Sequence, residues 1–399
     1  MTLLIDPPNA QGHGRLWSHL ASDTSYEELH DFARGLGIPS RGFDRDHYDI
    51  PAERYHAVIE AGATPVTSRE LVERLRRSGL RRRKSESLGP RKSGGPLVLP
   101  PRLRTGDTVA VTAPSGTVPA DRLAAGVRVL ESWGLDVRVL DSARGSHPEV
   151  SYLAATDAAR AADLTAAWSA PDVRAVFCAR GGYGAQRMVD LLDWRTFAAV
   201  GPKLLIGFSD VTCLHQAFAS RLGLATVHGP VVTSLGSGDE ESRAHLRALV
   251  MDAAPAASLT PTPGTALAAG RAAGVLSGGN VAMLATALGT RDAGSARGTI
   301  VVLEDVGEEP YRLDRLLTQL LRSGWFDGVR GIALGDFTDC GNPDEVTALL
   351  LERLTPLGVP VLGGVQVGHE RRNLAFPYGV PAVLDAGAGT LNLAGPAVV

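Results

Sequence analysis

A serine at position 209 stands at a sharp corner between two apolar segments of the chain. Residues 204–206 are Leu-Leu-Ile, Gly207 follows them, and residues 214–218 have the composition of a helix. A strand-to-helix corner of this kind lifts a serine hydroxyl out of the backbone at the carboxyl edge of a sheet. The pattern predicts a nucleophile elbow at Ser209, with an ordinary strand-to-helix turn as the alternative.

A second apolar segment, residues 176–179, lies before the serine in the sequence. It is followed directly by Arg180-Gly181-Gly182-Tyr183-Gly184. Glycine has no Cβ to block the approach to its backbone, so amides in such a turn can point at a developing oxyanion. Two strand-to-glycine corners close in sequence favour acyl-transfer chemistry more than either does alone. Each of them, taken singly, fits an ordinary turn equally well.

A serine nucleophile needs a base within hydrogen-bond reach and an acid that orients this base. Among the ten histidines, His369 lies in a polar loop after a glycine, and His228 follows a predicted strand close to the serine. For the acid, Glu304 ends a strongly apolar segment, whereas Glu308 and Glu309 follow a glycine. Spacing alone leaves both choices open.

The segments around the serine alternate between expected strands and helices. Strands at 108–113 and 136–140, with those that end near residues 179 and 206, predict a parallel, doubly wound sheet. Ligands bind such sheets at the carboxyl ends of the strands, so Ser115 is a candidate ligand contact as well as a possible plain turn serine. The expected fold class is α/β: a parallel doubly wound half with the serine, a C-terminal α/β half with mixed β segments, and a small separate α/β domain before both.

Residues from about 103 to 399 resemble the serine peptidases of the LD-carboxypeptidase family, which also contains the microcin C immunity peptidases. The matching segments agree in order and approximate spacing: 152–157, 180–184, 202–203, 207–212, 278–280, 303–308, 310–312, 368–369 and 373–374, with Pro377 and Gly379. Each segment is short, but together they are highly specific.

This resemblance implies a catalytic triad of Ser209, Glu304 and His369. It also implies an oxyanion hole formed by the backbone amides of Gly182 and Asp210. Neither a cofactor nor a metal ion is expected in this part of the chain. Members of the family are usually homodimers, so a homodimer is expected here as well.

The family cleaves the bond between an L-centre and a C-terminal D-amino acid, typically the terminal D-alanine of a cytoplasmic murein tetrapeptide. The expected function is therefore a serine LD-carboxypeptidase in cell-wall recycling. An immunity-type hydrolase of toxic peptidyl- or aminoacyl-nucleotides and a non-catalytic ligand-binding protein are the alternatives. Ser115, Tyr183 and Asn280 are the substrate-binding candidates. Val211 stands where the general hydrolase elbow has glycine, which argues against an ordinary lipase or esterase.

Residues 1–84 resemble a small uncharacterised bacterial domain instead. The resemblance rests on Asp6-Pro7-Pro8, His13-Gly14, residues 16–20 and residues 46–49. Within it, His19, Asp23, His47 and Asp49 are residue types that bind a divalent metal ion or an anion. We expect them to form one polar cluster, for which a purely structural network is the alternative.

Composition and overall sequence pattern limit the partners, the compartment and the domain divisions that can be expected. The chain of 399 residues has a net charge of −3 and three scattered cysteines, which favours neither a nucleic-acid partner nor a disulfide framework. No apolar run has the roughly 18 residues that a membrane helix needs, and no signal peptide is evident, so a cytoplasmic protein with a small peptide substrate is expected. The expected divisions are a small domain at 1–84, a linker at 85–100, the serine half at 101–240, a crossover at 241–270 and the C-terminal half at 271–399.

Overall fold

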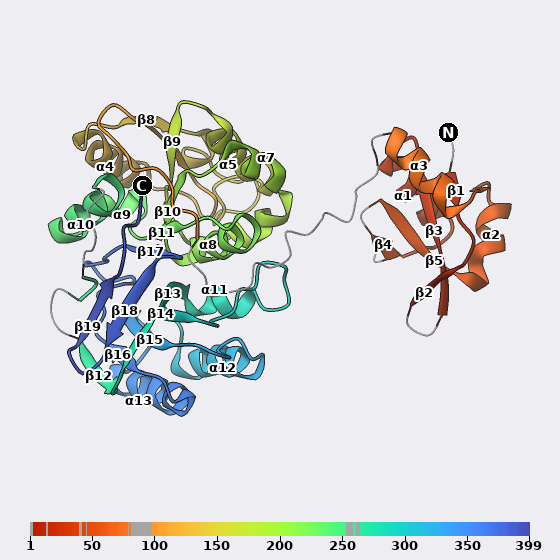
Figure 1. Ribbon diagram of the computed structural model, residues 1–399. Coiled ribbons are helices and arrows are strands. Elements are labelled where there is room, and N and C mark those ends of the chain that lie inside the picture. The colour runs from red at the N-terminus through yellow and green to blue at the C-terminus, as the bar shows by residue number, and fades with distance from the viewer. Residues whose placement is uncertain are drawn as a thin grey trace. The chain divides into compact units, whose positions relative to one another are not determined.

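The computed structural model divides into two compact units, Met1–Ser87 and Leu88–Val399 (Figure 1). The structure describes residues 3–12, 15–39, 42–44, 46–78, 80, 97–252, 258–260 and 264–399. The linker expected at 85–100 lies, up to residue 96, outside the described residues. No helix in the described ranges is long and apolar enough to span a bilayer.

The N-terminal unit is a six-stranded, mostly antiparallel sheet with helices on both faces. Its elements are β1 (Leu3–Ile5), β2 (Ala10–Gly12), β3 (Arg15–Ser22), α1 (Tyr26–Gly35), β4 (Phe43–Asp44), β5 (His47–Pro51), α2 (Tyr55–Glu60), β6 (Thr64–Pro65) and α3 (Ser68–Arg77). The strand order is β4-β5-β3-β1-β6, with β2 paired to β3. Because side chains alternate along a strand, Leu20 packs with Leu29 of α1 while Ala21 packs with Leu71 of α3.

The first half of the C-terminal unit contains the predicted parallel sheet. Its elements are β7 (Thr108–Thr112), α4 (Ala120–Ser132), β8 (Asp136–Val139), α5 (Asp157–Ser169), β9 (Val173–Cys178), α6 (Ala185–Met188), α7 (Trp194–Val200), β10 (Leu204–Gly207), α8 (Thr212–Ala217), β11 (Thr226–His228), α9 (Val232–Leu235) and α10 (Glu240–Met251). The five strands are parallel in the order β11-β10-β9-β7-β8. The serine corner and the glycine-rich turn follow the neighbouring strands β10 and β9, so both lie at the carboxyl edge of this sheet.

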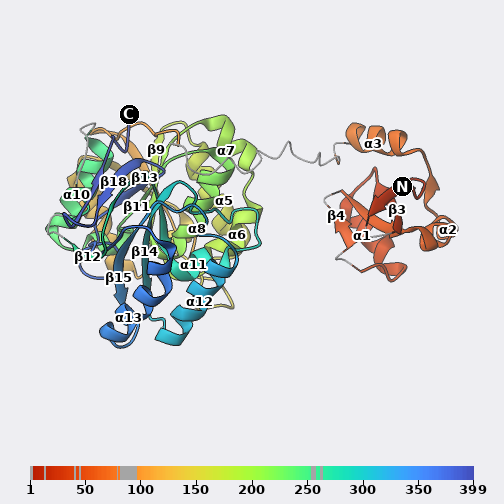
Figure 2. The ribbon, with the colours of Figure 1, turned by 60° about the horizontal axis from the view of Figure 1, so that its bottom comes forward.

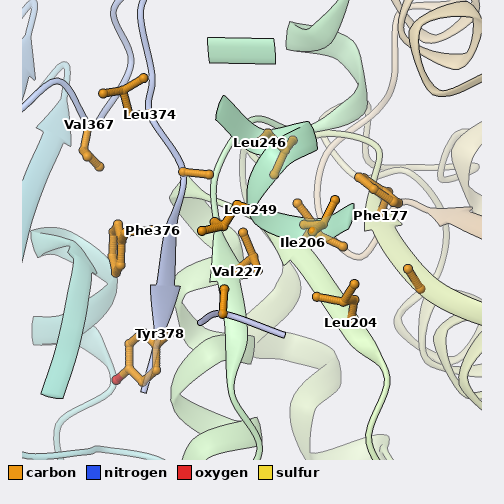
Figure 3. Close-up of a cluster of buried hydrophobic side chains, with 14 of the residues drawn as sticks. Phe177, Leu204, Ile206, Val227, Leu246, Leu249, Val367, Leu374, Phe376 and Tyr378 are labelled. Atoms are coloured by element: carbon orange, nitrogen blue, oxygen red, sulfur yellow. The ribbon is translucent and has the colours of Figure 1, made fainter. Parts of the chain in front are cut away.

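Both faces of this sheet are covered by helices, as expected of a doubly wound fold. Ile206 on β10 packs on one face in a cluster with Val232 of α9, whereas Leu205 packs on the other face with Leu214 of α8. The segment expected as a crossover begins with helix α10, and its Leu246 joins the core of the first face (Figure 3).

The second half of the C-terminal unit is a seven-stranded mixed sheet. Its elements are β12 (Thr265–Ala268), β13 (Arg271–Asn280), α11 (Val281–Thr286), β14 (Thr299–Val306), α12 (Pro310–Arg322), β15 (Gly331–Thr338), α13 (Pro343–Leu354), β16 (Val361–Gly363), β18 (Pro381–Asp385) and β19 (Thr390–Leu393). The strand order is β12-β16-β15-β14-β13-β18-β19. Helices α11, α12 and α13 pack on one face, where Leu303 and Leu334 meet Leu317 and Leu350 (Figure 2).

A short strand from the C-terminal part of the chain belongs to the sheet of the first half. β17 (Phe376–Tyr378) pairs antiparallel with β11, with Phe376 opposite His228. Phe376 and Tyr378 share a core with Leu204 and Val227 of the first sheet (Figure 3). The two halves of the C-terminal unit are therefore joined by backbone pairing as well as by apolar packing.

Candidate active site

Ser209 occupies the corner that the sequence predicts. β10 ends at Gly207, and from Ser209 the chain forms a single 3-10 turn that leads into α8. Ser209 has a φ of 63°, a left-handed backbone conformation that residues other than glycine adopt only where the surrounding structure imposes it. A Cβ at Gly207 would lie 2.9 Å from Val211 Cγ1, so glycine is needed for the corner to close. This geometry is that of a nucleophile elbow.

The glycine-rich turn after β9 lies directly against Ser209. A Cβ at Gly181 would lie 2.9 Å from Ser209 Cβ and 3.2 Å from its Oγ, so only glycine fits there. The next residue, Gly182, has a φ of 103°, and its amide has no acceptor among the described residues. The turn therefore offers an unbonded N–H one residue from its contact with the serine.

A buried arginine fixes this turn. Arg160 in α5 is 0% exposed and donates hydrogen bonds to the carbonyls of Gly184 (2.8 Å), Ala155 (3.1 Å) and Pro114. It also pairs with Asp157. One side chain thus ties together the turns that follow β7 and β9. Sequence reasoning missed it, because an arginine inside a helix is expected on the surface.

The residue after the serine adds a second tie. Asp210 is buried, and its Oδ2 accepts a hydrogen bond of 2.8 Å from the amide of Ala185. Burial raises the pKa of Asp210, while the Ala185 amide and the nearby Ser115 hydroxyl and Gly184 amide oppose the rise. The Asp210 side chain therefore holds the glycine-rich turn in register with the serine corner.

The structure corrects the expectation that Ser115 contacts a ligand. Ser115 is 0% exposed, and its hydroxyl faces Asp210. Its carbonyl accepts a hydrogen bond from the Ala154 amide, and the next residue, Gly116, donates to the carbonyl of Gly181. The turn after β7 therefore holds the glycine-rich turn in place through a backbone hydrogen bond.

Glu304 and His369 form a hydrogen-bonded pair. Glu304 lies on β14 with 0% exposure, and its Oε2 is 2.7 Å from His369 Nδ1. An ionised carboxylate at this position keeps the proton on Nδ1 and leaves Nε2 as the acceptor. The His369 side chain is 17% exposed, so its ring can be reached from outside. Among the described residues, neither Glu308 nor Glu309 forms a hydrogen bond or ion pair with this histidine.

The loop that contains His369 is held against the end of β15. The amide of Asp336 donates to the carbonyl of Val367 at 2.8 Å. Gly368 has a φ of 145°, and a Cβ there would lie 2.8 Å from Asp336 Cβ. On the other side, the Gly368 amide donates to Asn373 Oδ1 at 3.2 Å. These contacts leave His369 little freedom to move away from Glu304.

Phe208 joins the serine corner to the Glu304–His369 pair. The ring of Phe208, the residue before the serine, lies 4.8 Å from the His369 ring. The amide of Asn280 donates to Thr212 Oγ1 at 3.2 Å, and Asn280 is the register partner of Glu304 between β13 and β14. The second sheet thus brings its carboxylate to the start of α8, where the serine corner ends.

His228, the alternative base, has a different environment. It is 0% exposed and stacks on Phe376 with ring centroids 4.6 Å apart. Burial lowers its pKa well below the usual range, and the nearby His215 and His369 lower it further. Neither ring nitrogen has a hydrogen-bond partner in the described part of the chain. The arrangement therefore favours His369 as the base.

The two other substrate-binding candidates differ. Tyr183 is 48% exposed and forms an edge-to-face pair with Tyr152, which is also exposed, beside the glycine-rich turn. Asn280 is 4% exposed; its Oδ1 accepts from the Met283 amide, and its Nδ2 donates to Asp305 Oδ1. The structure thus corrects the expectation for Asn280, because its side-chain amide caps α11, while Tyr183 remains available to a ligand.

Two further carboxylates near the pair were not predicted from the sequence. Burial raises the pKa of Asp336 to about 7, and the negative charges of Glu370 and Glu304 add to the rise. Burial also raises the pKa of Asp305 to about 6, against the hydrogen bond from the Val306 amide. The charge around Glu304 therefore changes between mildly acidic and neutral pH.

In the N-terminal unit, three of the four predicted residues come together. His19, His47 and Asp49 each place a potential ligand atom within 4.8 Å of the others. Asp23 is not part of this group, because its Oδ2 accepts two hydrogen bonds from Arg74, at 2.9 Å and 2.5 Å. The expected cluster is thus corrected to three members.

Comparison with known proteins identifies the family of the C-terminal unit. Residues 109–229 match the LD-carboxypeptidase N-terminal domain, and residues 273–384 match the LD-carboxypeptidase C-terminal domain. A putative carboxypeptidase of Streptomyces coelicolor is 52% identical over 304 residues, which cover 76% of this chain and 98% of that protein. The chain belongs to the LD-carboxypeptidase family. It is therefore a peptidase, and the resemblance noted in the sequence is confirmed.

Other relatives cover the same part of this family member. The murein tetrapeptide carboxypeptidase of Pseudomonas aeruginosa is 40% identical over 69% of this chain and 92% of its own length. The structure of the muramoyltetrapeptide carboxypeptidase from Oxalobacter formigenes, 29% identical, superposes over 72% of this chain and 97% of its own with a TM-score of 0.61. An MccF-like protein from Bacillus anthracis, 22% identical over 75% and 99% of the two chains, shares the fold with a TM-score of 0.69. Residues 3–78 match a protein of unknown function (DUF4031).

Proposed function

We propose that this peptidase is a serine carboxypeptidase in which Ser209 is the nucleophile, His369 the base and Glu304 the group that orients the base. The hydrogen bond of 2.7 Å between Glu304 and His369 carries the proposal. It provides an oriented imidazole whose ring packs on the residue next to the serine. A serine hydroxyl becomes an effective nucleophile only with such a base beside it.

In the first step, Ser209 Oγ attacks the scissile carbonyl carbon while His369 Nε2 takes the hydroxyl proton. The negative charge that develops on the carbonyl oxygen is bound by the backbone amides of Gly182 and Asp210. The tetrahedral intermediate then collapses to an acyl-enzyme, and His369 gives its proton to the departing amine. Glu304 stabilises the imidazolium and keeps it in the orientation that both transfers need.

In the second step, His369 takes a proton from water as the water attacks the acyl carbon. Collapse of the second intermediate returns the proton to Ser209 and releases the shortened peptide. Both steps use the same three side chains, so loss of any one of them affects the whole cycle.

For the substrate, we propose a murein tetrapeptide that loses its C-terminal D-alanine. The identity to the murein tetrapeptide carboxypeptidase of Pseudomonas aeruginosa, 40% over 92% of that protein, supports this choice. A probable murein peptide carboxypeptidase of Bacillus subtilis, 34% identical over 92% of its length, also supports it. Exposed Tyr183 and Tyr152 beside the glycine-rich turn are the proposed contacts for the bound peptide.

An immunity-type hydrolase is the second candidate, because the microcin C7 self-immunity protein of Escherichia coli is 25% identical over 93% of its length. The purified protein is incubated with murein tetrapeptide, its all-L analogue and an aminoacyl sulfamoyl adenosine, and released amino acids are identified. Release of D-alanine from the tetrapeptide alone supports the main proposal. Release from the adenosine conjugate supports the immunity type, and binding without cleavage supports a non-catalytic protein.

We further propose that the protein acts in the cytoplasm as a homodimer, as is usual in this family. Light scattering of the purified full chain tests the oligomeric state. A mass equal to one chain of 41.8 kDa at micromolar concentration contradicts the dimer. Fractionation of cells after expression tests the compartment. The protein should be found in the cytoplasmic fraction, where the recycled murein peptides of the proposed substrate class are present.

A further inference from the structure

The N-terminal unit places two histidines and an aspartate on one face of its sheet. His19 on β3 and Asp49 on β5 are direct partners in the antiparallel register. His47 lies two residues before Asp49, and residues two apart along a strand point to the same face. The alternate residues Leu20, Tyr48 and Ile50 are buried in the core instead. The sheet itself therefore gathers the three polar side chains.

Each histidine is oriented by a buried carboxylate. Asp6 follows β1 and is 1% exposed; its Oδ2 lies 2.9 Å from His19 Nδ1, and its Oδ1 accepts from the His19 amide at 2.6 Å. Asp46 is also 1% exposed, and its Oδ1 lies 2.7 Å from His47 Nδ1. In both pairs the carboxylate faces Nδ1, so Nε2 is the ring nitrogen that remains to bind an ion.

The two rings are close and oriented at a steep angle. Their centroids are 4.8 Å apart with an interplanar angle of 80°. His47 Nε2 lies 3.4 Å from Asp49 Oδ1, and the potential ligand atoms of all three residues lie within 4.8 Å of one another. In a tetrahedral zinc site the ligand atoms are about 3.4 Å apart, so a shift of about 1 Å or less would bring these atoms to bonding distance of one ion.

We propose that His19, His47 and Asp49 bind a divalent transition-metal ion of the zinc type. Two imidazole nitrogens and one carboxylate oxygen form a donor set suited to such ions and poorly suited to calcium or magnesium, which prefer oxygen ligands alone. The hydrogen bonds that the two histidines donate to Asp6 and Asp46 are the outer shell that such sites commonly have.

Three protein ligands leave at least one coordination position for water or another small ligand, as in catalytic rather than structural zinc sites. The side chains of His19 and Asp49 are 30% and 46% exposed, so the position is open to solvent. The three residues belong to the N-terminal unit, whereas Ser209, Glu304 and His369 belong to the C-terminal unit. The proposal therefore stands independently of the peptidase activity.

The test is a titration of the metal-free full chain with Zn²⁺ by calorimetry and with Co²⁺ by visible absorption. One equivalent of each ion is expected to bind, with Co²⁺ bands of a site with nitrogen and oxygen ligands. His47→Gln and Asp49→Ala each remove one ligand, and both are expected to abolish this binding. Asp6→Asn keeps all three ligands and is expected to weaken the affinity by about 10- to 100-fold.

His56→Gln is the matched control, because His56 is exposed in the same unit and lies outside the cluster. It is expected to bind both ions as the unmodified chain does. Asp49 is exposed, so Asp49→Ala tests the site even where a change at a buried residue unfolds the unit; circular dichroism verifies folding. No binding by the unmodified chain, or unchanged binding by folded Asp49→Ala and His47→Gln, overturns the proposal.

Discussion

Replacement of Glu304 by glutamine tests the proposed mechanism most directly. The carboxylate is 0% exposed and lies 2.7 Å from His369 Nδ1, so the substitution removes one charge and keeps the shape. In the transition state His369 carries an extra proton, and two unit charges about 4 Å apart attract by about 4 kcal/mol at an effective dielectric constant of about 20. Loss of this attraction lowers kcat about a thousandfold.

The orientation of the new amide adds to this loss. Glu304 Oε1 has no hydrogen-bond partner among the described residues. If the glutamine turned its oxygen toward the histidine, its NH₂ group would take the place of Oε1, and no protein group would hold it there. When the amide NH₂ faces Nδ1 instead, the imidazole carries its proton on Nε2 and cannot accept one from Ser209. We therefore expect kcat to fall by between about 10³ and 10⁴.

The assay follows D-alanine released from murein tetrapeptide, with kcat and KM determined separately. KM should change little, because Glu304 is buried and interacts with the base rather than with the peptide. Glu309→Gln is the matched control, since Glu309 is exposed a few residues further along and, among the described residues, has no hydrogen bond or ion pair with His369 or Ser209. A folded Glu304→Gln protein with kcat within tenfold of the unmodified enzyme would refute the assignment of the acid.

Three further changes have distinct outcomes. Ser209→Ala should lower turnover by about 10⁴- to 10⁶-fold without loss of fold. Gly181→Ala should lower kcat about a hundredfold, because its Cβ would lie 2.9 Å from Ser209 Cβ and must displace the serine or the turn. Asp336→Asn should stabilise the protein above neutral pH. Because the pKa of Asp336 is raised to about 7 in the folded protein, ionisation of this carboxyl disfavours the folded state. The stability contributed by Asp336 is therefore present below about pH 4 and lost as the pH rises to about 7, and the asparagine variant avoids this loss. At about 1.4 kcal/mol per pH unit, roughly halved for solvent access, the gain is about 2 kcal/mol at pH 8 and small at pH 4.

Each of these changes has its own control. Circular dichroism must show that Ser209→Ala is folded, and near-normal turnover by the folded variant would mean that another group is the nucleophile. Gly294→Ala adds a methyl group where nothing lies within 4 Å, so it should leave kcat unchanged; equal losses at positions 181 and 294 would contradict the packing argument. Urea unfolding at pH 4 and pH 8 measures the Asp336 effect against exposed Asp344→Asn, and equal gains at both pH values would contradict it.

The serine corner was predictable from the sequence because its determinants are local. An apolar strand, a glycine and a helix follow one another within a few residues, and the structure has β10, Ser209 and α8 in that order. The alternation of strands and helices likewise predicted the doubly wound sheet, since each βα unit is encoded by its own segment. What these features share is that no distant part of the chain decides them.

The proposed partners of the serine were not decided by local pattern. Glu304, Glu308 and Glu309 lie close together in sequence, and only the register of β14 against β13 sets Glu304 opposite Asn280 and near His369. The motif resemblance, not periodicity, selected Glu304, the glutamate that the structure pairs with His369. For Ser115, burial depends on the turns around residues 154 and 181, which cover it from distant positions. Such burial leaves no trace in the spacing of residues around Ser115.

The short strand β17 explains how the chain brings its two halves together. Three residues with a central proline, Phe376–Tyr378, would not be predicted as a strand from propensity, and proline is tolerated here because β17 lies at the sheet edge. This strand begins a few residues after His369 and pairs with β11, next to the strand that ends at the serine corner. Before His369, the Val367 carbonyl accepts a hydrogen bond from the amide of Asp336 on the other sheet. The histidine loop is therefore anchored to one sheet on each side, so the distance between the proposed base, His369, and the proposed nucleophile, Ser209, depends on the packing of both sheets.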